Sequence, residues 1–137
     1  MPKGKLKNPE WIKVTCLYCD KEFDYYRDSA AIRKACYDCI PDDKQHDASL
    51  KRRLVKEKAV RVKGNKCEIC GETYPPGVYD FHHLDPAQKD FNIWNKHATV
   101  KWDIVEKEIE KCALLCANCH RLVHLGLAQI DEGNVIE

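Results

Sequence analysis

The sequence contains no long hydrophobic run. None of its apolar stretches approaches the roughly 20 residues that a membrane-spanning helix requires. Residues 1–11 contain Lys and Pro where a secretory signal would have an apolar centre. We therefore expect an intracellular, cytoplasmic protein that does not enter a membrane. In such a reducing compartment, Cys-x-x-Cys pairs bind metal more often than they form disulfides.

The chain also lacks the composition of a protein with a large apolar core. Charged residues make up 33% of its 137 residues, so the apolar residues are thinly spread. This length allows one ordinary domain or two very small ones, and very small units usually need disulfides or metal ions. The nine cysteines could meet that need. Composition therefore favours small units that are stabilised by metal.

Net charge is low, but the charge is unevenly distributed. Residues 1–66 hold 17 Lys and Arg against 10 Asp and Glu, a balance of +7. Residues 67–137 hold 6 against 12, a balance of −6. A basic segment suits a polyanion such as DNA, because it neutralises phosphates and releases counterions. Small proteins also have lopsided charge without a functional cause, so this observation alone does not decide.

The cysteines are arranged in pairs. Eight of the nine fall into four C-x-x-C pairs, and each pair suits a tight turn that directs two thiolates at one tetrahedral zinc. The first two pairs enclose 16 residues, as in a compact zinc ribbon, and the last two enclose 45, enough for an inserted active site. Sequential pairing is favoured because the alternatives need longer closures. It gives one set of Cys16, Cys19, Cys36 and Cys39, and a second set of Cys67, Cys70, Cys116 and Cys119. The remaining Cys112 is expected to be a small buried thiol on a helix before Cys116.

Local patterns predict an α+β fold made of zinc-stabilised units. Around the first pair, V-T-C-L-Y-C-D-K-E-F-D-Y-Y is typical of a strand, a metal-binding turn and a second strand. A helix is expected at about Ala48 to Val62, with Asp47 as its N-cap and Gly64-Asn65 as its stop. In the second half we expect strands at Val78–His82 and Phe91–Trp94, helices at Lys101–Lys111 and about Ala117–Leu127, and a frayed acidic tail at 128–137.

The first expected helix is strongly basic. Its narrow apolar stripe consists of Leu50, Leu54 and Val55, and charged residues crowd the rest of its surface. Such a helix could bind DNA phosphates, or it could be a solvated linker with one docked apolar edge; both readings stay open. The candidate DNA-binding side chains are Lys51, Arg52, Arg53, Lys56 and Arg61, together with Arg121 from the last expected helix.

Four histidines stand at spacings that suit a metal site. His120 and His124 are four residues apart on an expected helix, so both rings face one side and can share a cation. His82 and His83 are adjacent on an expected strand and therefore point to opposite faces. A metal-bound imidazole cannot accept a proton, whereas a free neutral one can. The pair can therefore supply one metal ligand and one base.

These motifs together resemble the HNH endonucleases of the ββα-metal type. The motif H-H-L-D-P begins at His82, and C-A-N-C-H-R-L-V-H runs from Cys116 to His124. The C-E-I-C knuckle at Cys67 precedes both of them. The resemblance covers about residues 67–124 and does not extend to the N-terminal half. It implies that a ββα-metal (HNH) domain spans 67–127. A zinc-ribbon-like unit would then occupy 1–43, a basic helical connector 44–66, and the acidic tail 128–137.

The resemblance implies distinct roles for the four histidines. His83 would be the general base that takes a proton from water, while His82 and His120 would bind a catalytic divalent cation, Mg, Mn, Ni or Zn. His124 matches the further helix ligand of the HNH-type colicin DNases. The second cysteine set would hold a closed, structural zinc, and the first set would hold another.

The sequence departs from the family at one position. The middle Asn of the HNH pattern usually lies about nine residues before the helix histidine, and Lys111 stands there. Asn92, Asn95 or Asn118 could substitute, and the sequence does not choose among them. Asp80 should share the face of His82, where it could support a histidine or be solvated.

The expected function is hydrolysis of DNA phosphodiester bonds by a metal-dependent endonuclease. The alternative is a non-catalytic zinc protein that binds nucleic acid or a protein partner, and a nuclease directed at RNA is a weaker third option. A pure binding module does not need the four histidines, which is why the enzyme is favoured. Phage packaging, restriction, homing and defence all use such domains, so an origin in a phage or mobile element is one option, and the sequence does not choose among these roles.

Overall fold

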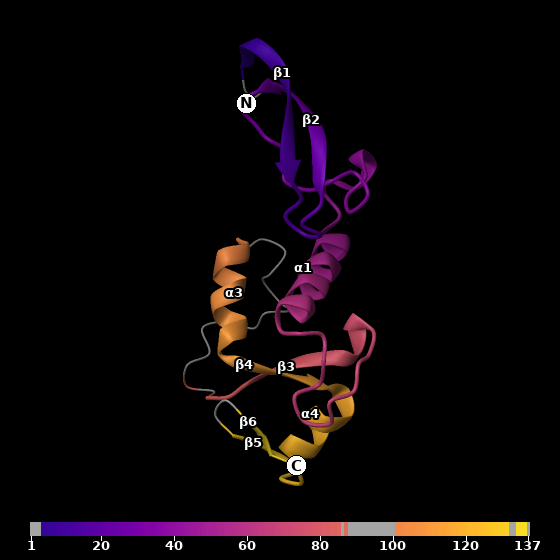
Figure 1. Cartoon of the computed structure of the whole chain (residues 1–137), viewed down its shortest axis with the longest axis vertical. Helices are drawn as coiled ribbons and strands as arrows, with labels where there is room; N and C mark the ends of the chain where they lie inside the picture. Colours follow the sequence, from indigo (N-terminus) through magenta and orange to yellow (C-terminus); the bar gives the residue numbers. More distant parts are fainter. Residues whose placement is uncertain (1–3, 86, 88–100, 132–133, 137) are drawn as a thin grey trace. The chain divides into compact units, whose positions relative to one another are not determined.

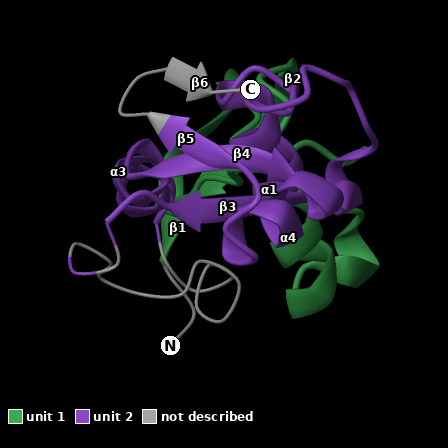
Figure 2. Ribbon diagram, turned by 90° about the horizontal axis from the view of Figure 1, so that it is seen from below, with its two compact units in different colours: residues 1–54 green, residues 55–137 purple. Residues whose placement is uncertain are grey.

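The computed structural model describes residues 4–85, 87, 101–131 and 134–136. The chain forms two compact units, residues 1–54 and 55–137, which are coloured separately in Figure 2. The division falls inside the basic helix α1, Ala48–Val62. The expected strand at 91–94 lies outside the described residues. Within the described part of the chain, no helix is long and apolar enough to cross a membrane.

Unit 1 is built on a two-stranded antiparallel sheet. Strand β1, Lys5–Thr15, lies beside β2, Glu22–Ser29 (Figure 1). The two strands pair from Thr15 opposite Glu22 to Lys5 opposite Ser29. The register shifts between Lys5 and Glu10, and Pro9 falls in this irregular stretch, where a missing backbone N–H is tolerated. The strand–turn–strand order expected around the first cysteine pair is therefore confirmed. A short 3-10 helix η1, Asp42–Lys44, follows.

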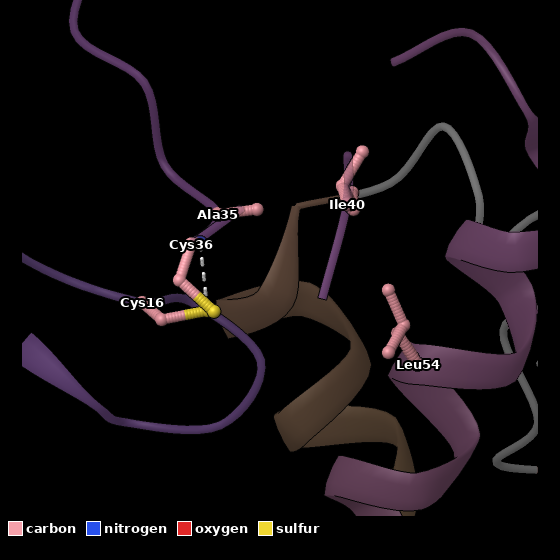
Figure 3. Packing of buried hydrophobic residues seen from close by; sticks show 5 residues of the cluster. All are labelled: Cys16, Ala35, Cys36, Ile40 and Leu54. Carbon is pink, nitrogen blue, oxygen red and sulfur yellow. Dashed lines mark hydrogen bonds between the residues drawn. The ribbon is translucent and has the colours of Figure 1, made fainter. Parts of the chain in front are cut away.

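The core of unit 1 surrounds its cysteines. Cys16 and Cys36 are buried, and the backbone N–H of Cys36 donates to the Cys16 sulfur at 3.2 Å (Figure 3). Ala35, Ile40 and Leu54 complete the buried cluster. A core of five such residues is small, which agrees with the expectation that the unit needs a metal ion.

Helix α1 begins and ends where the sequence predicts. The Asp47 side chain accepts a hydrogen bond from the backbone N–H of Leu50 at 3.0 Å, which caps the first turn. Gly64 and Asn65 both adopt positive φ, and their N–H groups donate to the carbonyls of Arg61 and Val60. This pattern is the Schellman motif, which satisfies carbonyls that the helix leaves unpaired.

Unit 2 is built on a second two-stranded antiparallel sheet. Strand β3, Tyr79–His83, follows a 3-10 helix η2, Pro76–Val78, and pairs with β4, Cys112–Cys116. Helix α3, Trp102–Glu110, precedes β4, and α4, Ala117–His124, follows it directly. The two helices lie on opposite sides of the sheet (Figure 1). All five residues of β4 are buried, as expected for a strand covered on both faces.

Three expectations for unit 2 need correction. Cys112 is buried as predicted, but it lies in β4 and not on a helix. The last helix stops at His124 instead of Leu127, because Gly126 takes a positive φ and a second Schellman pattern closes the helix. The tail expected to be frayed forms an antiparallel hairpin of β5, Gln129–Asp131, and β6, Asn134–Ile136. The chain is thus a small mixed α+β protein with short sheets.

Candidate metal centres

The two cysteine sets come together as sequential pairing predicts. In unit 2, Cys67 and Cys70 lie on the turn before η2, Cys116 ends β4, and Cys119 lies in the first turn of α4. Their four sulfurs lie within 4.8 Å of one another. The sulfurs of Cys16, Cys19, Cys36 and Cys39 converge in the same way in unit 1. All nine cysteines belong to the described residues and are free thiols.

The first pair of each set forms the same local structure. The N–H of Cys16 donates to the Lys21 carbonyl, and the N–H of Cys67 donates to the Glu72 carbonyl five residues on. The residue after the second cysteine, Asp20 or Gly71, adopts a positive φ in both turns. Such a turn directs two sulfurs to the same side.

One thiol in each cysteine set has a lowered pKa, which favours the thiolate form that binds metal. Burial raises the pKa of Cys67, but backbone N–H groups that donate to its sulfur outweigh this and lower the pKa to about 7. The pKa of Cys16 is about 7 for the same reasons. For Cys39 and Cys119, burial and neighbouring sulfurs raise the pKa. Four thiols held this close repel one another once ionised, and a cation removes that repulsion. Both sets therefore could hold a zinc ion, which four thiolates bind as a closed tetrahedral site.

Three histidines form a further cluster in unit 2. His82 comes from β3, and His120 and His124 come from α4. One ring nitrogen from each lies within 4.8 Å of the other two. The Nε2 atoms of His120 and His124 are 3.0 Å apart. The order β4, Cys116, α4 explains this placement, because the strand leads into the helix without a loop and fixes its first two turns beside β3.

Asp80 holds one of these rings in a defined orientation. Asp80 is two residues before His82 on β3, and its Oδ2 is 3.1 Å from Nδ1 of His120. An ionised carboxylate only accepts, so His120 carries its proton on Nδ1 and turns the lone pair of Nε2 to the cluster. A carboxylate behind a histidine is the usual support of a metal-binding imidazole. Of the two readings left open for Asp80, the structure therefore favours contact with a histidine.

The pKa of His82 also suits a metal ligand. Burial lowers this pKa, and the positive charges of the neighbouring histidines lower it further. The ring is then neutral over a wider pH range, and only a neutral imidazole can bind a cation. The donor set therefore fits a divalent cation, and three imidazoles favour a transition metal over Mg²⁺.

His83 points to the opposite side of β3, away from the other three histidines. Its Nε2 lies 2.8 Å from Oε1 of Glu108 on α3, and the His83 side chain is 11% exposed. Glu108 itself is 1% exposed, and its Oε2 lies 3.0 Å from Nζ of Lys111. Sequence reasoning missed Glu108. The signal was available, because Glu108 lies three residues after Val105 on the apolar face of the helix, where a charged residue needs a partner.

The predicted DNA-binding residues differ in exposure. Arg52, Arg53, Arg61 and Arg121 are exposed, whereas Lys51 and Lys56 are partly buried. Burial lowers the pKa of Lys56, and the negative charge of Asp80 opposes this shift.

Lys58 departs from the solvated face that the basic helix predicts. It is 8% exposed, and its Nζ lies 4.5 Å from the centre of the Trp102 ring. A cation–π contact of this kind explains how the helix can bury an ammonium group.

Lys111, where the HNH pattern has Asn, pairs with Glu108. Of the possible substitutes, Asn118 is exposed on α4, while Asn92 and Asn95 lie outside the described residues. Asp85 accepts a hydrogen bond from the N–H of Ala87 at 3.0 Å and so forms an Asx turn at the end of the H-H-L-D-P motif.

Comparison with known proteins finds no relative of this chain. No family model matches it, and no curated protein or solved structure does so either. Its class is therefore defined by its own fold and sites: a small α+β protein with two four-cysteine clusters that could hold zinc.

Proposed function

We propose that this protein is a metal-dependent DNA endonuclease of the HNH type. The observation that carries the proposal is the convergence of His82, His120 and His124 from a strand and a helix. His83 follows His82 on the same strand and projects from its other face, where it contacts Glu108. Sheet β3–β4 and helix α4 would be the ββα unit of that family. The four cysteines of unit 2 would pin the helix to the sheet. The sequence motifs, which occur in the family's order, support the same assignment.

Each histidine then has one task in phosphodiester hydrolysis. His82, His120 and His124 would hold a divalent cation, with Asp80 supporting His120. When bound, this cation would neutralise charge on the scissile phosphate and on the leaving oxygen. His83 takes a proton from the attacking water, as a general base does. The products would be a 5′-phosphate and a 3′-hydroxyl, as in the family that the sequence resembles.

The basic side chains of helix α1 would contact the phosphates of DNA. Lys51, Arg52 and Arg53 lie on successive positions of α1, and Arg61 lies near its end. Such residues neutralise phosphates without reading sequence, so the proposed contacts would contribute affinity more than specificity.

A non-catalytic zinc protein is the second candidate, and one feature of unit 1 favours it. Trp11 and Tyr26 face each other across the β1–β2 sheet with ring centres 5.4 Å apart, and both are exposed, Trp11 by 70%. Exposed aromatic rings on a small zinc unit are suited to stacking on bases or to contacting a partner protein.

A plasmid-cleavage assay separates the two candidates. The full chain is incubated with supercoiled DNA and Mg²⁺, Mn²⁺, Ni²⁺ or Zn²⁺, with a chelator as the blank. We expect cleavage by the wild type, and a loss of about 10²- to 10⁴-fold in the His83→Ala variant, since general-base catalysis contributes that much. The matched control is His46→Ala, which removes an exposed histidine of unit 1. Absence of cleavage with every metal would favour the binding module, and full activity of His83→Ala would exclude the mechanism.

A further inference from the structure

Glu108 is a buried acid that has no role in the reaction as proposed above. It lies on α3 with 1% of its surface exposed. A carboxylate this deeply buried is costly unless it is paired and hydrogen-bonded. Both of its oxygens have a partner: Oε1 contacts Nε2 of His83 at 2.8 Å, and Oε2 contacts Nζ of Lys111 at 3.0 Å.

The donors in this network determine where the protons lie. The ammonium group of Lys111 has no acceptor, so Oε2 of Glu108 must accept from it. An ionised carboxylate also accepts at Oε1, so Nε2 of His83 must carry a proton. In the neutral ring, the lone pair is then on Nδ1. The ring has one orientation and one tautomer because Glu108 is oriented by Lys111.

We propose that Glu108 is the positioning residue of the His83 base and that Nδ1 is the atom that accepts the proton. Lys111 would orient Glu108 from the position where the HNH pattern has Asn. This inference rests on the proposed nuclease function. In the reaction, an O–H bond of water breaks and an N–H bond forms at Nδ1. The oxygen bonds to phosphorus, the bond from phosphorus to the 3′ oxygen breaks, and that oxygen takes a proton from solvent.

The substitution Glu108→Gln tests the proton arrangement with little change of shape. The carbonyl oxygen of the new amide must face Lys111, because Lys111 can only donate. The NH₂ group then faces His83 and also donates, which forces Nε2 to accept and moves the ring proton to Nδ1. We expect kcat to fall by about 10²- to 10⁴-fold with KM unchanged, since the base is blocked and DNA binding is not. The matched control is Glu110→Gln, an exposed acid on the same helix.

A second substitution should restore part of the loss. In Glu108→Gln/Lys111→Met the amide no longer has to accept from an ammonium group, so it can rotate and offer its oxygen to Nε2. We expect kcat to rise at least about tenfold over Glu108→Gln. A side chain with only a packing role would not show such rescue. A double variant that is no more active than Glu108→Gln would overturn the part assigned to Lys111.

Nitrogen-15 NMR of the zinc-loaded full chain reads the tautomer directly and does not depend on activity. At alkaline pH we expect the wild-type His83 ring to carry its proton on Nε2 and the Glu108→Gln ring to carry it on Nδ1. A wild-type ring protonated on Nδ1 would overturn the inference even if no variant folds. If the wild type cleaves no DNA, the proposed function fails. In that case the His83 tautomers of the wild type and of Glu108→Gln still show whether Glu108 orients the ring.

Discussion

The contact between Asp80 and His120 predicts how tightly the three-histidine cluster binds a cation. In Asp80→Ala, the Nδ1–H of His120 loses the carboxylate oxygen 3.1 Å away, and the ring can rotate or change tautomer. Loss of such a supporting group typically weakens metal binding by about 10- to 100-fold, or about 1.4–2.7 kcal/mol. Because the Asp80 side chain is 40% exposed, solvent screens its charge, and we expect the lower end, about tenfold.

Cobalt is a suitable probe because its absorption reports histidine ligands, whereas zinc in the cysteine sets is silent. Co²⁺ would be titrated into the zinc-loaded chain and followed by absorption and calorimetry. Asp80→Asn should bind with intermediate affinity, because its oxygen can still accept from Nδ1–H without the charge. Asp85→Asn is the control, since it preserves an Asx turn outside the cluster. Wild-type affinity in Asp80→Ala would refute the role given to Asp80.

Two further predictions concern pH and stability. Zinc binding to the cysteine sets should release protons and should weaken as the pH falls, because protons compete with zinc for the thiolates; the loss should become steeper below about 7, the pKa of Cys16 and Cys67, where these two thiols are protonated as well. Titration with a zinc-sensitive dye at several pH values measures this, and a pH-independent affinity would contradict it. Tyr79→Phe should destabilise the fold by about 1–3 kcal/mol, because the buried hydroxyl accepts from the N–H of Tyr74 and donates to the Asn65 carbonyl. Urea denaturation of the zinc-loaded chain provides the value, and an unchanged midpoint would show that water replaces both contacts.

The parts of the fold that follow from short-range chemistry could be predicted from the sequence. Helix α1 has an Asp cap and a Gly-Asn stop, and both act within a few residues. The grouping of the cysteines follows from the length of chain between the pairs. Strand β4 could not be predicted in this way. Its C-A-L-L-C run is apolar throughout, and such a run fits a buried strand and a buried helix equally well.

The supporting contacts of the candidate site were less accessible to sequence reasoning. The opposite directions of His82 and His83 follow from strand geometry and are confirmed by their different partners. Glu108 comes from a helix 25 residues further along the chain, so nothing local links it to His83. The departure at Lys111 was visible, but its pairing with a buried acid depends on the packing of α3 against the sheet.

The junction between β4 and α4 links the cysteine set of unit 2 to the histidine cluster. Cys116 ends the strand, and its sulfur accepts from the N–H of Cys119, so one thiol both caps the helix and belongs to the cysteine set. His120 is the next residue along. A zinc ion held by the cysteine set would strengthen the start of this helix and, with it, the position of His120 beside β3. If the protein is the nuclease proposed above, zinc at the cysteine set and the cation at the histidines would be coupled through this junction, and loss of the zinc would weaken the second site as well.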